Sequence, residues 1–121
     1  MSSPTAYAFV ALGSATGGCL RFALASLGDG RWAGLPLGTF AVNVLGCIAI
    51  GWIGAVWGER EWVRHLVMVG ILGGFTTFSA FAFQTLGMIR DGRVGAGLAY
   101  AGLSVALCLL GVWLGWALGR P

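Results

Sequence analysis

Three runs of this sequence contain no charged residue and are each long enough to cross a lipid bilayer as a helix. They extend over Trp32–Gly58, Leu66–Ile89 and Val94–Gly119, and a membrane-spanning helix needs only about 20 apolar residues. A fourth run, about Ala6–Leu27, is interrupted only by Arg21. Hydrophobic residues make up 58% of the chain and charged residues 9%, which leaves too little polar surface to coat a water-soluble domain. The sequence therefore predicts an all-α integral membrane protein of four transmembrane helices.

Short polar loops separate the four spans. Charged residues and glycine cluster at Gly28–Arg31, Gly58–Glu61 and Arg90–Arg93, a composition typical of turns, so neighbouring helices are expected to be antiparallel. The N-terminal segment lacks the positive region of a cleavable signal, so the first run is expected to remain as a span. We therefore predict one four-helix transmembrane domain over residues 1–121, with spans at about 6–27, 35–57, 66–89 and 95–118.

The arginines are distributed evenly between the two predicted sides of the membrane. The side that holds both termini and the second loop carries Arg60, Arg64 and Arg120, and the opposite side carries Arg31, Arg90 and Arg93. Because an excess of Lys and Arg in cytoplasmic loops normally fixes orientation, this chain has no electrostatic reason to prefer either one. We expect dual topology. The natural assembly of mixed orientations is an antiparallel homodimer with its two-fold axis in the membrane plane.

The residues that enzyme chemistry requires are missing from the spans. The single histidine, His65, lies in a loop, and no acidic residue falls within a span, so no Ser/His/Asp or metal cluster can be assembled. The sequence therefore predicts that the protein is not an enzyme, and its arginines are too dispersed to bind nucleic acid. Cys19, Cys47 and Cys108 are an odd number, lie in three different spans and are expected to be small packing residues.

Polar and flexible residues interrupt the third span. Gly73 and Gly74 are followed by the β-branched Thr76 and Thr77 and then by Ser79. Glycine and β-branched residues in succession disfavour a continuous helix. One reading is a helix break near mid-membrane, whose freed backbone carbonyls could bind a small cation. The other is an intact, glycine-rich packing helix in which the threonine hydroxyls bond to their own turn.

Two other spans carry polar side chains along one helix face. Thr39 and Asn43 are four residues apart in the second span, and Tyr100, Ser104 and Cys108 repeat every four in the fourth. Polar groups are costly against lipid, so these faces should point inward, where they pair between helices or donate hydrogen bonds to a passing anion. For Ser104 taken alone, we expect a hydrogen bond between helices.

Arg21 and three phenylalanines are further candidates. An arginine inside a membrane is a candidate functional residue, but Arg21 is near enough to a helix end to extend to the interface instead. Phe75, Phe78 and Phe81 are spaced by three, and such residues are more often core. An aromatic ring also has a positive edge that can face an anion in a dry pore.

The chain resembles the Fluc (CrcB) family of fluoride channels. The resemblance is carried by the strings Gly17–Phe22 (GGCLRF), Pro36–Asn43 (PLGTFAVN) and, most specifically, Gly73–Phe81 (GGFTTFSAF). It implies a dual-topology antiparallel homodimer with two fluoride pores. It also implies a central structural sodium ion, held by main-chain carbonyls of the broken third helix from both subunits, which here would belong to Gly73 and Thr76.

The resemblance also implies roles for individual side chains. Phe78 and Phe81 correspond to phenylalanines that line the anion route, and Arg21 matches an arginine of the first helix. Asn43 would supply an amide donor, and Ser79, Tyr100 and Ser104 would supply hydroxyl donors. With Thr39 added from the polar face of the second span, the expected anion pathway comprises Arg21, Thr39, Asn43, Phe78, Ser79, Phe81, Tyr100 and Ser104.

The function that the resemblance implies is a fluoride-selective channel in the bacterial plasma or inner membrane, through which fluoride leaves the cytoplasm passively. The chain departs from the family at Ala80, Ala82 and Gln84, the last near a position where the family usually has glutamate. The rival function is a small multidrug/proton antiporter of similar size, but that chemistry needs a carboxylate within the membrane. A passive packing subunit would explain the glycines but not the aligned donors.

Overall fold

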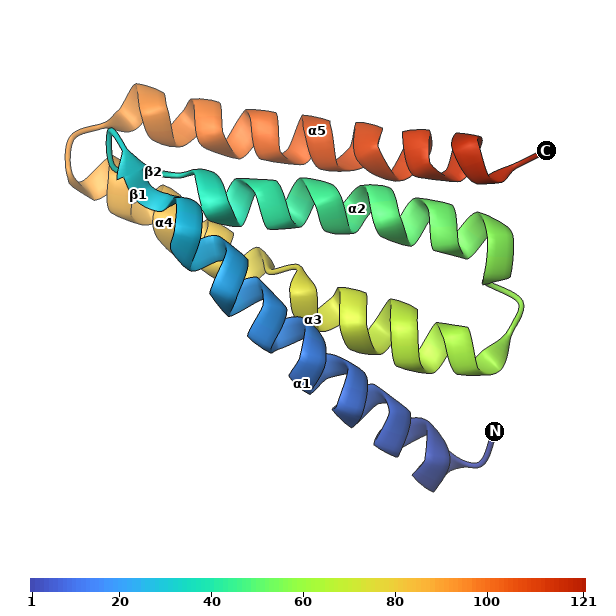
Figure 1. Cartoon of the computed structure of the whole chain (residues 1–121). Helices are drawn as coiled ribbons and strands as arrows, with labels where there is room; N and C mark the ends of the chain where they lie inside the picture. Colours follow the sequence, from blue (N-terminus) through green and yellow to red (C-terminus); the bar gives the residue numbers. More distant parts are fainter.

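The computed structural model describes residues 1–121 and contains four helical segments of membrane-spanning length. They are antiparallel along the chain (Figure 1). The elements are α1 (Ser3–Gly28), β1 (Asp29–Trp32), β2 (Leu35–Pro36), α2 (Leu37–Trp57), η1 (Val63–Leu72), α3 (Gly73–Phe75), α4 (Phe78–Arg90) and α5 (Val94–Gly119). The third span is built from η1, α3 and α4, and η1 is wound as a π-helix. The prediction of four transmembrane helices, the third of them broken, is confirmed.

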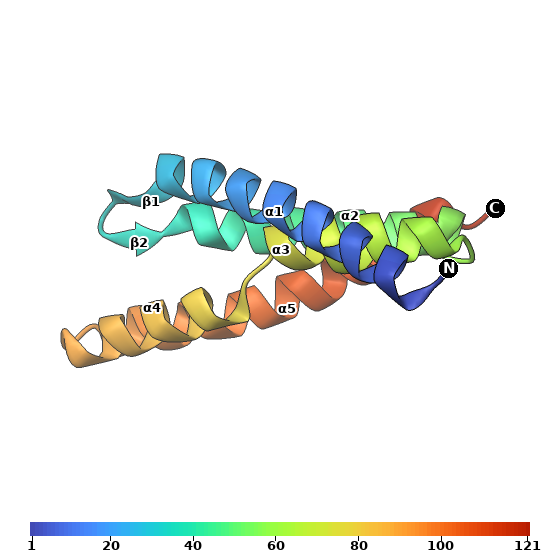
Figure 2. The ribbon, with the colours of Figure 1, turned by 90° about the horizontal axis from the view of Figure 1, so that it is seen from below.

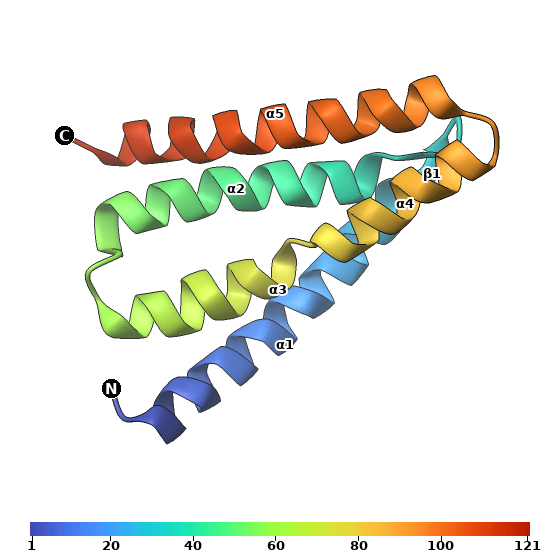
Figure 3. The ribbon, with the colours of Figure 1, turned by 180° about the vertical axis from the view of Figure 1, so that it is seen from behind.

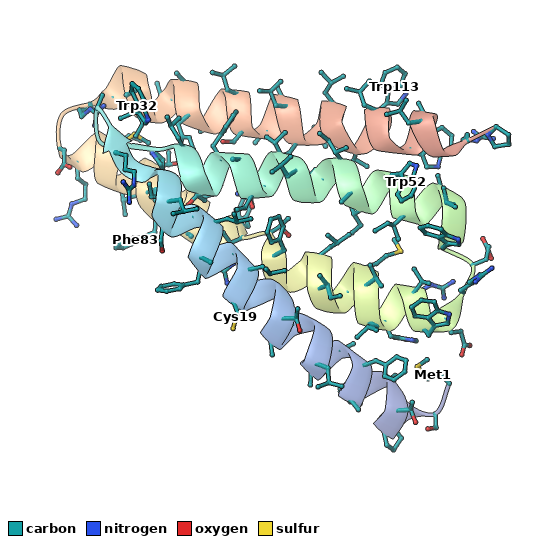
Figure 4. All side chains as sticks on the ribbon, in the orientation of Figure 1. Met1, Cys19, Trp32, Trp52, Phe83 and Trp113 are labelled. Atoms are coloured by element: carbon teal, nitrogen blue, oxygen red, sulfur yellow. The ribbon has the colours of Figure 1, made fainter.

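Most of the surface of the bundle is apolar. Only 19 of 121 residues are buried, so the greater part of each helix faces lipid or another protein rather than an interior of its own. Figure 2 shows why the interior is small, because α4 and the start of α5 diverge from α1 and the two strands. Side chains such as Cys19, Phe83 and Trp113 point away from the bundle (Figure 4).

Glycines set the two closest helix contacts. A Cβ added to Gly17 of α1 would lie 1.9 Å from the carbonyl oxygen of Ile71 in η1. A Cβ on Gly115 of α5 would lie 2.1 Å from the carbonyl oxygen of Ile48 in α2. The helix backbones are therefore in contact, as small residues four apart allow in membrane helices. Gly54 is different, because only the flexible end of Met68 comes near it.

A β-hairpin replaces the plain loop expected between the first two spans. Strands β1 and β2 are antiparallel, with Trp32 paired to Leu35. The two residues between them, Ala33 and Gly34, have positive φ values of 51° and 70°, as a type I′ turn requires. The hairpin places Asp29 at the start of α2, where its carboxylate accepts a hydrogen bond from the backbone N–H of Thr39 at 2.8 Å.

Both termini and the α2–η1 loop lie at one end of the bundle (Figure 3). The N-terminal ammonium of Met1 pairs with the Glu61 carboxylate, and this hydrogen bond and charge hold the pKa of Glu61 below its usual range. At the same end, the guanidinium of Arg120 lies 4.2 Å above the Trp116 ring, a cation–π contact. Trp52 and Trp57 meet edge to face with centroids 5.1 Å apart.

Candidate ion pathway

The third span is broken at Thr76 and Thr77. Both residues are extended, with φ and ψ of −92° and 157° at Thr76 and −148° and 123° at Thr77. The stretch appears as the thin connection between α3 and α4 in Figure 2. The Thr76 hydroxyl donates to the Leu72 carbonyl at 3.0 Å. A threonine bonded to its own helical turn was expected for an intact helix, and here it occurs beside the break.

Asn43 of α2 holds the break open. Its Nδ2 donates to the Thr77 carbonyl at 3.0 Å, and its Oδ1 accepts from the Thr77 N–H at 2.8 Å. One side-chain amide thus satisfies both backbone groups of Thr77, which unwound backbone in a membrane requires. The Thr77 hydroxyl then begins α4 by accepting from the Ala80 N–H at 3.1 Å.

These contacts divert two backbone donors from their helical partners. In a continuous helix the N–H of Thr77 would bond to the Gly73 carbonyl, and the N–H of Ala80 would bond to the Thr76 carbonyl. Here they donate to Asn43 and to the Thr77 hydroxyl instead. The protein has no group of three or more His, Cys, Asp and Glu side chains that could hold a metal ion. A cation at the break would therefore depend on backbone carbonyls such as those of Gly73 and Thr76.

Arg21 lies on the α1 side of the break. Its Nε donates to the Gly74 carbonyl at 3.0 Å, so the guanidinium caps the end of α3. Arg21 is not among the residues that line the groove described next. Its charge stabilises a helix C-terminus, where the partial charge of the backbone is negative.

A groove of about 280 Å³ lies beside the break, between α2, α4 and α5. It brings together four of the expected pathway residues, which are Asn43, Phe78, Phe81 and Ser104. Ser104 is 4% exposed and its hydroxyl has no hydrogen-bond partner. The expected bond between Ser104 and another helix is therefore absent, and the groove contains a free, buried hydroxyl donor.

Aromatic rings continue from the groove toward the strands. The centroids of Phe78 and Phe81 are 5.4 Å apart, and those of Phe81 and Tyr100 are 5.3 Å apart, all tilted. Phe81 is buried, whereas Phe78 is 77% exposed. Ser79 is also exposed, and its hydroxyl lies 3.4 Å from that of Thr77. Phe78 and Ser79 therefore face outward from the single chain.

Thr39 and Tyr100 lie outside the groove, in a polar network at its strand end. The Tyr100 hydroxyl donates to Gln84 Oε1 at 2.9 Å, and Gln84 Nε2 donates to Thr39 Oγ1 at 2.9 Å. The Thr39 hydroxyl in turn donates to Asp29 Oδ2 at 2.7 Å. Both hydroxyl hydrogens are thus committed to protein acceptors, unlike that of Ser104.

Two members of this network, Gln84 and Asp29, do not follow from the sequence. Gln84 stands there as a departure from the family near an acidic position, and Asp29 lies in a polar loop. A signal for Gln84 was present, since an amide within an apolar span needs a partner. Asp29 gave no such signal, because its role depends on the hairpin that brings it to α2.

The chain is similar to proteins of one family. Residues 8–116 match the family model described as CrcB-like protein, Camphor Resistance (CrcB). A protein of Paramagnetospirillum magneticum named fluoride-specific ion channel FluC is 51% identical over 118 residues, covering 90% of this chain and 91% of the relative. A protein of the same name from Thermus thermophilus is 43% identical over 120 residues, covering 93% and 94%. One from Opitutus terrae is 42% identical over 116 residues, covering 90% and 88%. This chain belongs to the CrcB-like protein family.

Proposed function

We propose that this multi-pass bacterial membrane protein is a fluoride-selective channel that lets fluoride leave the cytoplasm passively, which lowers cytoplasmic fluoride and its toxicity. Family membership supports the substrate, and one structural observation carries the route. The buried hydroxyl of Ser104 has no partner and lies in the groove beside Asn43, Phe78 and Phe81. An unpaired buried donor costs free energy, which an anion in the groove would recover.

The groove suits a small anion. Asn43 uses one Nδ2 hydrogen for the Thr77 carbonyl, so the second remains for an ion. The phenylalanine edges carry partial positive charge. Because fluoride is small and strongly hydrated, dense donors in a narrow passage are needed to replace its water. A negative internal potential pushes anions outward with about 2.3 kcal/mol per charge per 100 mV.

The same proposal includes an antiparallel homodimer. Phe78 is 77% exposed on the single chain, so a second copy is needed to close that side of the route against lipid. The equal number of arginines on the two sides supports insertion in both orientations. An inverted copy would bring the two breaks together across a two-fold axis in the membrane plane.

A structural sodium ion at that axis completes the proposal. The carbonyls of Gly73 and Thr76 are the two whose helical N–H donors are diverted, and Gly73 is exposed on the single chain. Unwound carbonyls at mid-membrane are the groups that coordinate sodium in membrane proteins. Two carbonyls from each copy would surround one ion.

Proton-coupled antiport fits less well. It requires a carboxylate within the membrane to exchange protons for cations. None of the four spans contains Asp or Glu, and Asp29 lies in β1 at the end of the bundle.

The test is ion efflux from liposomes that contain the purified protein, driven by a potassium diffusion potential. We expect rapid loss of fluoride and retention of chloride. Ser104→Ala should slow fluoride efflux about 10- to 100-fold, because a hydrogen bond to a charged group contributes about 1.5–3 kcal/mol. The thermal midpoint of the variant should not fall, since no internal hydrogen bond is lost and an unpaired buried hydroxyl is removed.

Ser26→Ala is the matched control, because Ser26 is exposed and its hydroxyl donates to the Phe22 carbonyl of its own helix. Its efflux should equal that of the unmodified protein. Retention of fluoride by liposomes of the unmodified protein would overturn the proposal. Equal efflux through Ser104→Ala would remove Ser104 from the route.

A further inference from the structure

Two of the three cysteines line the same groove. Cys47 of α2 and Cys108 of α5 both open onto it, from two helices that pack directly against each other. A Cβ on Gly111, one turn beyond Cys108, would lie 3.6 Å from the Cys47 Cβ. Both thiols are free. The spacing of the sequence, with one cysteine in each of three spans, gave no sign of this pair.

Other polar groups surround the pair. Ser104 precedes Cys108 by one helical turn, and its buried hydroxyl in the same groove has no partner. The remaining wall is apolar and includes Phe81, Val105 and Leu109. No third anionic ligand is available, because no group of three or more His, Cys, Asp and Glu side chains occurs. The pair can therefore supply two soft sulfur ligands and one weak oxygen ligand.

We propose that Cys47 and Cys108 form a binding site for a soft divalent cation of the mercuric type. Thiolate sulfur selects soft cations, and mercuric ion accepts two thiolates without requiring further ligands. On binding, two S–H bonds break, two S–metal bonds form and two protons leave, with no electron transfer. The complex of one divalent ion with two thiolates is neutral, whereas a monovalent soft cation would leave a net negative charge. A divalent ion is therefore favoured over a monovalent one, because a net charge is costly in an apolar membrane groove.

Cys19 supplies the comparison within the same chain. It is exposed and points away from the bundle (Figure 4), and it is not among the residues that line the groove. A single thiol binds mercuric ion through one sulfur and loses it to competing thiols in solution. The Cys47–Cys108 pair holds the ion through two sulfurs at once, so its release requires both bonds to exchange.

The experiment uses the full-length protein in detergent, with its thiols first shown by thiol titration to be reduced. Cys19→Ser is the reference variant, and Cys47→Ser and Cys108→Ser are each added to it. Each protein is loaded with mercuric ion and dialysed against excess glutathione, and retained mercury is measured by elemental analysis. Proton release on loading is recorded in parallel.

We expect the Cys19→Ser protein to retain about one mercury per chain and to release two protons for each ion. Either added substitution should lower retention about tenfold or more, because one thiolate is lost. Size-exclusion profiles confirm that the variants are folded. Equal retention by the single-thiol variants, or no retention by the Cys19→Ser protein, would overturn the proposal. Neither measurement depends on fluoride conduction.

Discussion

Asn43 shows how one side chain can fix an otherwise costly backbone conformation. A side-chain amide carries a donor and an acceptor at a fixed separation, and Thr77 offers a carbonyl and an N–H in extended geometry. The Asn43 amide thus pairs with Thr77 as a neighbouring β-strand would, through one N–H and one carbonyl. Lipid offers no hydrogen bonds in the hydrocarbon region, so the amide supplies both partners there.

Asn43→Leu should lower the free energy of unfolding by about 2–4 kcal/mol, since it leaves two buried backbone groups without partners. Thermal unfolding in detergent measures the change. Thr85→Ala is the control, because the Thr85 hydroxyl donates only to the Phe81 carbonyl of its own helix. Equal midpoints for the two variants would show that Asn43 does not hold the break.

The network at the strand end makes a second prediction about single residues. Tyr100 donates its hydroxyl to Gln84, so Tyr100→Phe should cost about 1 kcal/mol of unfolding free energy in the unmodified protein. In a Gln84→Leu background the acceptor is gone, and the same change should cost nothing. A double-mutant cycle by thermal unfolding measures this coupling, and additive effects would contradict the network.

At the scale of elements, the distance between neighbouring helices is set by glycines at which two backbones touch. The α1–η1 contact at Gly17 and the α2–α5 contact at Gly115 leave no room for a methyl group. Without a hydrophobic driving force between helices in lipid, close packing of this kind holds spans together. A neighbouring glycine, Gly18, meets nothing within 4 Å, so adjacent positions of one helix differ sharply in tolerance.

Gly17→Ala should separate α1 from η1 and reduce the yield of folded protein severely, because its methyl group would meet the Ile71 carbonyl. Gly18→Ala should fold normally and serves as the matched control, since both changes raise helix propensity equally. Yield after size-exclusion chromatography compares them. A normal yield of Gly17→Ala would show that α1 can move away without cost.

The sequence predicted these elements unevenly, for physical reasons. The spans were predictable because a bilayer demands long apolar runs. Glycine and threonine disfavour a helix but left an intact packing helix open as well, and the family resemblance favoured the break. The hairpin was not, since its turn at Ala33 and Gly34 lacks the usual Asn-Gly or Asp-Gly pair. The four-residue spacing of polar side chains predicted the hydrogen-bond donors. Only the fold shows that the Ser104 hydroxyl has no partner, whereas those of Thr39 and Tyr100 donate to other side chains.

At the scale of the whole molecule, one chain is too open to form a closed route. The proposed dimer closes it, and the proposed sodium ion joins the two breaks. Protein purified with a large organic cation in place of sodium should therefore lose dimer stability and fluoride efflux together. Analytical size-exclusion and liposome efflux measure the two effects, and restoring sodium is the control. Indifference of both to sodium would remove the ion from the proposal.

The pairing of Asn43 with Thr77 also has a consequence for the order of synthesis. Until an amide meets it, an unwound peptide group in hydrocarbon costs several kcal/mol. The ribosome makes α2 before the third span, so Asn43 is already in the bilayer when Thr77 arrives. The amide that the break needs is therefore in place before the break itself, and the nascent third span is expected to unwind against α2 rather than on its own.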